Sequence, residues 1–451
     1  MASTSISVAT SGTPTNNKKF TFSFWVKRHK LGSAQNIYIH ERGSGFAHTH
    51  KIEFGFHSSD SFFFGTWDGS NEYYSRTKRK FKDTNAWMHI MIVVDSTQST
   101  NTNRLKWYFN GEQYTIDGAA YDAGPSYPAQ NWVFDSNTWT HNIGRYVAGS
   151  GASNYLDASL SDFCFVDGQA LTPSSFGETD TDTGEWRIKD FTAGDITWGT
   201  NGYRILKDGN SITDVSSNSH NFTSDTGTLT KTEDCPSNVF ASFNPLVPDA
   251  GSSGLYHGNT QHNVDTANWR STFSTLGMTT GKYYFEALKS NGSHGMIGVR
   301  GVEQCNGSYA GNNDHIGVVS QGWALYNADG IVKNNNNDVG SSIGTYANGD
   351  YMGCFLDCDN SKLYFSKNGT MMNTTGYSIT AGLTYMFGVS GHSTYRWVCN
   401  FGNGAFGATQ LTGTTYNGSD GNGIFKYNPN NITLDGSSKS FKSLSTKGLN
   451  T

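Results

Sequence analysis

Three acidic side chains alternate over residues 178–182: Glu178, Asp180 and Asp182. Alternate residues of a strand share one face, and two carboxylates about 5 Å apart on one face can hydrolyse a glycosidic bond with retention. Carboxylates gathered in a turn also suit Ca²⁺, which prefers oxygen ligands. However, Gly184 interrupts the alternation, and the segment has neither an apolar face nor the EF-hand spacing. The pattern therefore favours an exposed acidic loop, with a calcium site as the alternative and a catalytic role as the weakest interpretation.

Histidine and basic residues form two more groups. His48, His50 and His57 lie on neighbouring strand candidates, and His48 and His50 share a face that could bind a metal; a packed or exposed pair is the favoured interpretation. The basic run of residues 76–82 (RTKRKFK) could contact nucleic acid or anionic cell-surface glycans, although a solvated hairpin or an interface with the acidic middle of the chain is the favoured interpretation. Because the whole chain is acidic, with a net charge of −5, we expect no nucleic-acid binding. The sequence contains no nucleophile elbow, P-loop or dinucleotide fingerprint.

Aromatic side chains off the core pattern are candidates for carbohydrate binding, because sugar rings stack on exposed aromatic rings. Trp107 and Trp323 lie on strong strand patterns and are assigned to cores. The candidates are in the first half of the chain, and a place in a core or interface is the alternative for each: Trp67, Tyr73, Tyr74, Trp132 and Trp139.

The composition favours strands and turns over helices. Of 451 residues, 15% are charged and 14% aromatic, and the 53 glycines include many Asn-Gly and Asp-Gly turn signals. The six cysteines show no zinc spacing, so we predict free thiols. No signal-peptide pattern follows Met1, and no apolar run approaches membrane length. We therefore expect folding in a reducing cytoplasm without membrane insertion.

A two-strand pattern occurs twice, about 250 residues apart. Residues 91–95 and 104–111 form the first copy, and residues 352–357 and 362–369 form the second. In each copy an apolar strand ends at Asp and an alternating strand ends at Asn-Gly, which tolerates the positive φ of a tight hairpin turn. The repeat predicts an all-β chain with two antiparallel sandwiches of the concanavalin-like jelly-roll type.

The remaining segments suggest a layout around these two domains. We expect a first sandwich over residues 18–177 and a second over residues 240–410, joined by an acidic connector over residues 178–239. Residues 1–150 hold 15 Lys and Arg against 11 Asp and Glu, whereas residues 151–270 hold 6 against 16. Polar arms are expected over residues 1–17 and 411–451, and arms of this kind stay ordered by docking onto a neighbour.

Several segments resemble known families. Residues 20–26 (FTFSFWV), 87–95 (WMHIMIVVD) and 107–111 (WYFNG) resemble laminin-G and pentraxin-type concanavalin A-like lectin domains. Residues 281–286 (GKYYFE), 322–326 (GWALY), 353–357 (GCFLD) and 400–402 (NFG) resemble a SPRY domain. In SPRY-like domains, polar loops form the partner-binding rim. The resemblance therefore implies a contact surface at one such loop: Asn334, Asn335, Asn336, Asn337 and Asp338.

The segments between the two domains resemble phrases that recur in virion proteins of bacteriophages, notably marine and cyanophage-like ones. They are residues 165–178 (FVDGQALTPSSFGE), 199–203 (GTNGY) and 235–245 (CPSNVFASFNP). The resemblance implies a structural protein of the tail fibre, minor structural or decoration type. Because the first sandwich begins within about 20 residues of Met1 and no coiled-coil or collagen-like repeat follows, we expect a compact appendage, fibre tip or decoration protein.

The sequence therefore predicts a non-enzymatic virion protein, without a required cofactor, that aids host attachment. Its expected partners are host cell-surface carbohydrate, other virion proteins and further copies of itself in a symmetric oligomer. A concanavalin-like glycan depolymerase and a ligand-free cement protein of capsid or tail are the alternatives.

Overall fold

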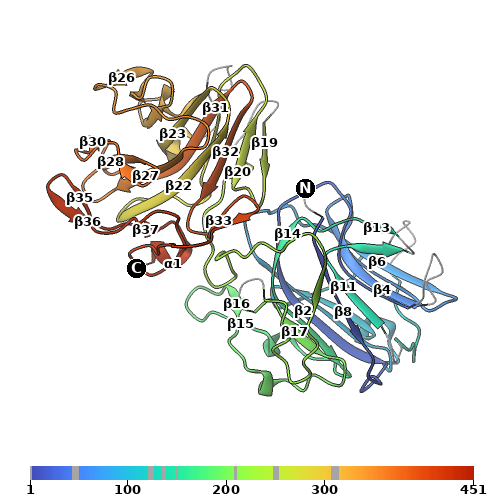
Figure 1. Ribbon diagram of the computed structural model, residues 1–451. Coiled ribbons are helices and arrows are strands. Elements are labelled where there is room, and N and C mark those ends of the chain that lie inside the picture. The colour runs from blue at the N-terminus through green and yellow to red at the C-terminus, as the bar shows by residue number, and fades with distance from the viewer. Residues whose placement is uncertain are drawn as a thin grey trace. The chain divides into compact units, whose positions relative to one another are not determined.

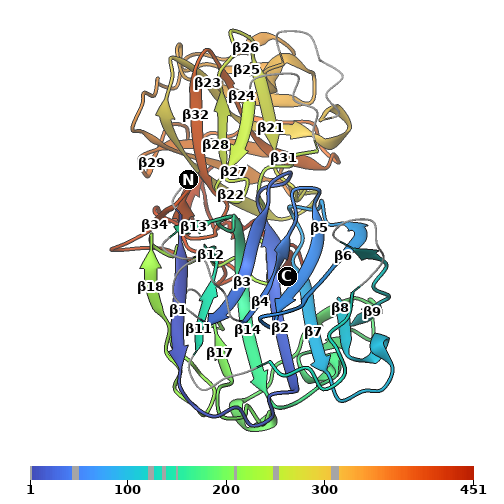
Figure 2. The ribbon, with the colours of Figure 1, turned by 90° about the vertical axis from the view of Figure 1, so that its right-hand side faces the viewer.

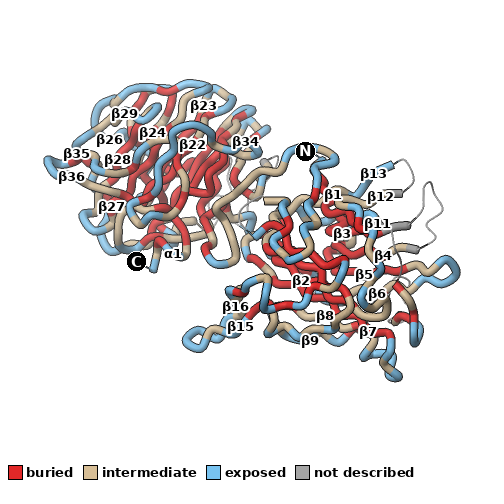
Figure 3. The backbone as a smooth tube through the Cα atoms, turned by 60° about the horizontal axis from the view of Figure 1, so that its bottom comes forward, coloured by how far each residue is buried: buried red, intermediate tan, exposed pale blue. Residues whose placement is uncertain are grey.

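The computed structural model describes residues 3–42, 50–119, 126–134, 139–148, 151–207, 211–246, 253–305 and 314–450. The chain forms two compact units, Met1–Leu229 and Thr230–Thr451, and both are β-sandwiches of antiparallel sheets (Figure 1). Buried residues are concentrated inside each unit (Figure 3). The predicted all-β fold class with two sandwich domains is confirmed. No helix among the described residues is long and apolar enough to cross a membrane.

The first unit packs two large sheets face to face (Figure 2). Its larger sheet, within the described ranges, has the strand order β10 (Gly118–Ala119), β6 (Glu72–Lys80), β5 (Ser61–Trp67), β4 (His50–Phe56), β3 (Gln35–Arg42), β11 (Trp139–Ile143), β1 (Ser5–Thr10) and β18 (Thr223–Thr226). Its smaller sheet has the order β17 (Tyr203–Ile205), β14 (Ala158–Asp167), β2 (Lys19–Arg28), β7 (Met88–Asp95), β8 (Leu105–Phe109) and β9 (Glu112–Tyr114). Alternation places Phe20, Phe22 and Phe24 of β2 in the core between the sheets.

The second unit repeats this arrangement with different strands. Its larger sheet follows the order β19 (Ser253–Tyr256), β20 (Gln261–Val264), β32 (Tyr395–Asn400), β22 (Lys282–Asn291), β27 (Tyr351–Asp357), β28 (Lys362–Lys367) and β29 (Thr370–Met371), and β30 (Tyr377–Ser378) and β37 (Lys442–Ser443) join it at the side. The facing sheet follows the order β21 (Arg270–Phe273), β31 (Tyr385–His392), β23 (His294–Gly301), β24 (Gly322–Tyr326), β25 (Val332–Asn334) and β26 (Asn337–Val339).

Short elements complete the two units. Two-stranded hairpins are β12 (Tyr146–Ala148) with β13 (Gly151–Ser153), β15 (Gly177–Thr179) with β16 (Trp186–Ile188), β33 (Ala405–Phe406) with β34 (Thr409–Gln410), and β35 (Ile432–Leu434) with β36 (Ser437–Lys439). The helical segments are 3₁₀ turns at Asn101–Asn103, Pro173–Ser175, Ala193–Asp195, Val302–Gln304 and Ile316–Val318, and the α-helix α1 (Thr446–Leu449).

The repeated two-strand pattern has the predicted geometry in both units. Asn110 and Gly111 have φ of 50° and 80°, and Asn368 and Gly369 have φ of 52° and 83°. They form the turns between β8 and β9 and between β28 and β29. The pattern also occupies equivalent places, since β2-β7-β8-β9 and β22-β27-β28-β29 are both consecutive in their sheets. The Asn-Gly hairpin prediction is therefore confirmed.

The segments predicted as an N-terminal arm and a connector contribute strands to the first sandwich. Ser5–Thr10 forms β1, which pairs with β11 and β18, and Tyr203–Ile205 forms β17 beside β14. The hairpin β15–β16 packs its Trp186 ring closely against Gly111 and Gly177, where a Cβ atom would overlap the indole. The first unit therefore extends to Leu229, because these polar segments pair through backbone hydrogen bonds that side-chain patterns do not reveal.

Asp167 fastens two of the joining segments to the first sandwich. One carboxylate oxygen accepts hydrogen bonds from the backbone N–H groups of Thr15 (2.9 Å) and Asn201 (3.2 Å). The Asp167 N–H donates to the Trp198 carbonyl, and Asn201 Nδ2 donates to the Gly12 carbonyl. Residues 165–178 and 199–203 therefore contain side chains that stabilise the fold of the first unit.

The polar C-terminal segment predicted as an arm packs on the second unit. β37 pairs in parallel with β22, and Phe425, Leu434 and Phe441 are fully buried in a cluster with aromatic residues of the larger sheet. Glu286 anchors this segment by accepting hydrogen bonds from the N–H groups of Lys426 (3.0 Å) and Tyr427 (2.7 Å). Burial raises the pKa of Glu286 to about 7, against the opposing effect of these hydrogen bonds. This segment is held by its own domain, and the sparse apolar residues that anchor it show no periodicity.

Candidate binding surface

The predicted aromatic candidates separate onto two faces of the first unit. Trp132 is only 6% exposed and belongs to the core, so its assignment to a sugar site is wrong. Tyr73 packs against the same core from β6. The backbone of Trp139 lies in β11, and its side chain lies outside the described residues. Trp67 and Tyr74 alone among the described candidates lie on the outer face of β5 and β6, away from the core.

An aromatic platform forms on this outer face. Tyr74 and Phe63 stack with ring centroids 5.4 Å apart and an interplanar angle of 10°. Gly65 pairs with Tyr74 across the strands, and a Cβ atom there would lie 3.0 Å from the Tyr74 ring. Glycine therefore lets the tyrosine ring lie close to the sheet, half-exposed, with Phe63 buried beside it. Half-exposed Trp67 continues the platform at the end of β5.

Basic side chains continue the same face. Arg76 pairs with Phe63, and Lys80 pairs with Ser61, so both lie on the outer face past Tyr74. Burial and the charges of Arg76 and Lys80 lower the pKa of His57, which shows that the three groups lie near one another. Within the described ranges, no carboxylate forms an ion pair with Arg76 or Lys80. We call Phe63, Trp67, Tyr74, Arg76 and Lys80 the aromatic–basic strip.

The acidic segment, predicted as an exposed loop with a calcium site as the alternative, is paired with an arginine. Arg187 of β16 bonds to Glu178 (Nε to Oε1, 3.0 Å) and to Asp180 (Nη1 to Oδ2, 2.6 Å). The other Asp180 oxygen accepts the N–H groups of Asp182 and Thr183, which forms the turn and lowers the pKa of Asp180. Among the described residues, no group of three or more His, Cys, Asp or Glu side chains could hold a metal ion. The ion pair therefore agrees with the favoured interpretation of an exposed acidic loop.

The predicted histidine pair cannot be compared with the structure, since His48 and the side chain of His50 lie outside the described residues. A different histidine, His89 of β7, lies beside Ser23 of β2, with Nε2 2.8 Å from Oγ. Trp186 donates its indole N–H to His89 Nδ1 (3.1 Å), so Nε2 carries the proton and donates to the serine. His89 in this tautomer cannot take a proton from Ser23, and the pair has a structural role.

The second unit carries an aromatic surface that sequence patterns did not reveal. Trp269 lies 5.4–6.5 Å from the rings of four residues on one face of the smaller sheet: His294, His315, Tyr326 and His392. Except for buried His315, these side chains are half-exposed. Strand alternation offers a signal, because His294 and His392 share the outward parity of Met296 and Met386. The separate segments, however, only meet in the folded sheet.

The predicted partner-binding loop lies beside this surface. Asn335 and Asn336 have positive φ and form the turn between β25 and β26. Asn334 Nδ2 donates to the carbonyls of Ser320 and Gly322, and Asp338 pairs with Lys333. Residues 335–338 are exposed. Asn337 Nδ2 also donates to the Asn335 carbonyl, so these contacts shape the loop, and residues 335–338 form its exposed tip.

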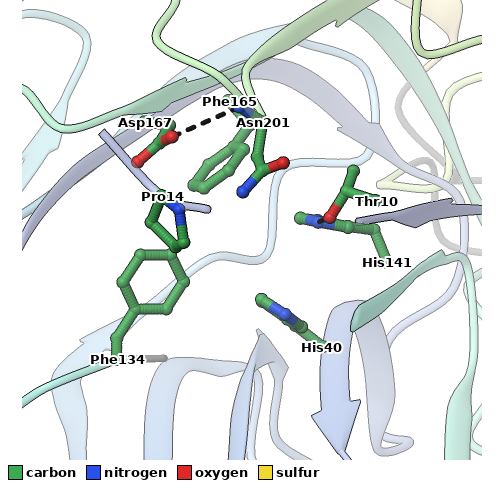
Figure 4. Close-up of a pocket in the computed structure, with 8 residues that line it drawn as sticks. All are labelled: Thr10, Pro14, His40, Phe134, His141, Phe165, Asp167 and Asn201. Carbon is green, nitrogen blue, oxygen red and sulfur yellow. Dashed lines mark hydrogen bonds between the residues drawn. The ribbon is translucent and has the colours of Figure 1, made fainter. Parts of the chain in front are cut away.

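An interior cavity of the first unit is too small for a sugar. It is lined by Thr10, Pro14, His40, Phe134, His141, Phe165, Asp167 and Asn201 (Figure 4). Its volume of about 10 Å³ accommodates roughly one water molecule. This cavity therefore cannot hold a sugar ring.

Comparisons with known proteins identify both domains. The sequence profile of the concanavalin A-like lectin/glucanases superfamily (Laminin_G_3) matches residues 2–175, and that of the SPRY domain matches residues 282–403. The chain contains a concanavalin A-like domain and a SPRY domain. Both predicted domain types are thus confirmed, and the aromatic–basic strip belongs to the concanavalin A-like domain. No curated protein sequence matches the chain.

Solved structures with similar parts include the SPRY domain of human HERC1, with 14% identity and a TM-score of 0.30, covering 38% of this chain and 100% of that chain. A heptameric SAP-like pentraxin from Limulus polyphemus has 15% identity and a TM-score of 0.28, covering 38% of this chain and 72% of that chain. The TRIM65 PSpry domain has 14% identity and a TM-score of 0.30, covering 39% of this chain and 90% of that chain.

Proposed function

We propose that this chain is a non-enzymatic structural protein of a bacteriophage particle that binds carbohydrate on the host cell through its concanavalin A-like domain. The aromatic–basic strip is the single observation that carries the binding proposal. Tyr74 offers a half-exposed ring, backed by Phe63 and seated over Gly65. A ring fixed before binding loses little conformational entropy when a sugar stacks on it.

Binding is favoured over cleavage of the glycan because the candidate catalytic carboxylates have other partners. Arg187 pairs with both Glu178 and Asp180. On the outer face of the larger sheet, Glu53 of β4 is held by Lys51 (2.8 Å) and Asn36 (2.9 Å). A retaining glycosidase needs two carboxyl groups facing the substrate. The depolymerase alternative predicts loss of glycan cleavage when Glu178, Asp180 and Asp182 are all replaced by amides.

The place in a phage particle is supported by the sequence of the joining segments, which resemble those of phage virion proteins. Tail fibre, appendage and capsid or tail decoration are the classes that fit. Immunogold labelling of purified particles with antibodies to this chain tests this part, since a virion protein labels a fixed site. Native mass spectrometry of the purified chain tests the expected symmetric homo-oligomer, because it gives the number of copies in the assembly.

A glycan array tests the binding proposal. We expect the full chain to bind a subset of glycans, and Tyr74→Ala to weaken that binding about tenfold, because stacking on one ring contributes roughly 1–2 kcal/mol. Tyr256→Ala is the control, since Tyr256 is 45% exposed on the other domain. Binding at background level for the unaltered chain would contradict the proposal and favour a ligand-free cement protein.

A further inference from the structure

We infer that the aromatic–basic strip selects acidic saccharides, in which a carboxylate or phosphate group accompanies the sugar ring. Tyr74 stacks on the ring, and Arg76 and Lys80 bind the anionic group. This inference rests on the proposed carbohydrate-binding function and specifies its ligand class.

The register of β5 and β6 sets the spacing of the three side chains. Their partners on β5 are Gly65 for Tyr74, Phe63 for Arg76 and Ser61 for Lys80, which are successive alternate residues. Alternate residues of a strand lie about 7 Å apart, so Tyr74 and Arg76 are neighbours on one face. Lys80 follows on the same face after a bulge, because β6 advances by four residues from Arg76 to Lys80 where β5 advances by two. A short acidic oligosaccharide that stacks on Tyr74 therefore extends directly over both cations.

The cations of the strip are not neutralised by any carboxylate of the described residues. Arg76 and Lys80 have no ion-pair partner within the described residues, and the nearby Asp60 is buried in a pair with Arg28 (3.1 Å). Burial and, to a smaller extent, the charges of Arg76 and Lys80 lower the pKa of His57, which lies at the same end of the strip. Glu72 lies at the opposite end, facing Trp67. The anionic group is therefore expected at the Arg76 end of the strip.

The SPRY-domain surface around Trp269 shows the contrasting arrangement. Lys333 is paired with Asp329 (2.6 Å) and Asp338, Arg396 with Asp265 (2.6 Å), and Arg300 with Asp314 (2.9 Å). Cations that are already neutralised offer little to an anionic ligand. The two surfaces therefore differ in charge although both present half-exposed aromatic rings.

Lysines on a sheet edge also have a structural role, because they discourage pairing with another edge. This role accounts for Lys78, whose N–H is bonded to Asp117 beyond the short pairing of β10 with β6. It does not account for Arg76, which is paired on both sides, with Phe63 of β5 and Gly118 of β10.

The test measures binding of the full chain to three immobilised polysaccharides: dextran (neutral), polygalacturonate (carboxylate) and yeast phosphomannan (phosphate). We expect an acidic polymer to bind at least tenfold more tightly than dextran, and Arg76→Gln and Lys80→Gln each to weaken that binding about tenfold. Lys106→Gln, the same charge change on the other sheet of the domain, should leave binding unchanged. Thermal melting of each variant confirms folding.

The outcomes separate the inference from the proposed function. Equal binding of dextran and acidic polymers that depends on Tyr74 but not on Arg76 or Lys80 would overturn the inference and keep carbohydrate binding. Absence of binding to every polysaccharide here and on the glycan array would overturn both. Single-stranded DNA is a further ligand in the same assay. If the chain binds it as tightly as it binds the acidic polysaccharides, and Tyr74→Ala does not weaken that binding, the strip is a general polyanion surface and the inference is overturned.

Discussion

Acid should destabilise the concanavalin A-like domain through two buried histidines. His89 bonds to Ser23 and Trp186, and His141 bonds to Thr10 (3.2 Å) and Tyr38 (2.7 Å), both fully buried. Burial lowers the pKa of each to about 3. An unfolded histidine has a pKa near 6.5, so between these values the unfolded state binds more protons than the native state. Stability contributed by the neutral rings is therefore present above pH 6.5 and is lost as pH falls toward 3.

The size of the effect follows from the two pKa values. At pH 5 the native ring is neutral and the unfolded ring is protonated, which costs about 2 kcal/mol per histidine relative to pH 7.5. Together, the two histidines therefore lower the free energy of unfolding by about 4 kcal/mol between pH 7.5 and pH 5. This is a large share of the roughly 5–15 kcal/mol that is the typical free energy of unfolding of a domain.

Hydrogen exchange of β2 and β7 amides, measured by mass spectrometry on the full chain, reports the opening free energy of this domain alone. In the unaltered chain this opening free energy should fall between pH 7.5 and pH 5. His89→Gln should make that fall smaller by about 2 kcal/mol, although the substitution destabilises the domain at both pH values. Ile90→Val, a core change beside it with no titrating group, should keep the full fall. An equal fall in the unaltered chain and in His89→Gln would refute the assignment of a neutral buried His89.

The remaining predictions concern other buried groups. The pKa of Glu286 is about 7 in the folded state, above its unfolded value, so the free energy of unfolding of the SPRY domain should fall by up to about 3 kcal/mol as pH rises from 4.5 to 7. Hydrogen exchange of β22 measures this fall, and Glu286→Gln should make it smaller. Asp162→Asn should cost roughly 3–5 kcal/mol in denaturant unfolding, because it leaves Arg204 buried without its ion pair (2.6 Å). Gly177→Ala should cost about 1–3 kcal/mol by overlap with Trp186, whereas Gly194→Ala, whose nearest neighbour atom would be 3.8 Å away, should cost little in the same assay.

Strand alternation and turn chemistry predicted the parts of the fold that depend on local sequence. The Phe20, Phe22 and Phe24 alternation marks the core face of β2, and Asn110 and Asn368 mark hairpin turns by their tolerance of positive φ. The short strands β18 and β37 escaped prediction because their polar residues carry no periodic signal, and backbone pairing with distant strands defines them.

The candidate site was predicted only where a face could be read from one strand. Trp67 and Tyr74 lie on the outer face as proposed, whereas Trp132 lies in a loop without periodicity and fills the core. Cross-strand register, which the pattern of a single strand does not reveal, brings Arg76 and Lys80 onto the same face as Tyr74. The Trp269 surface escaped prediction for the same reason, since its five rings come from five separate segments.

A crystal structure of the full chain with a bound acidic oligosaccharide, such as trigalacturonate, tests the central claim most directly. The account predicts a sugar ring stacked on Tyr74, with a carboxylate within hydrogen-bond distance of Arg76 or Lys80. An oligosaccharide bound around Trp269 of the SPRY domain, with the aromatic–basic strip empty, would contradict it.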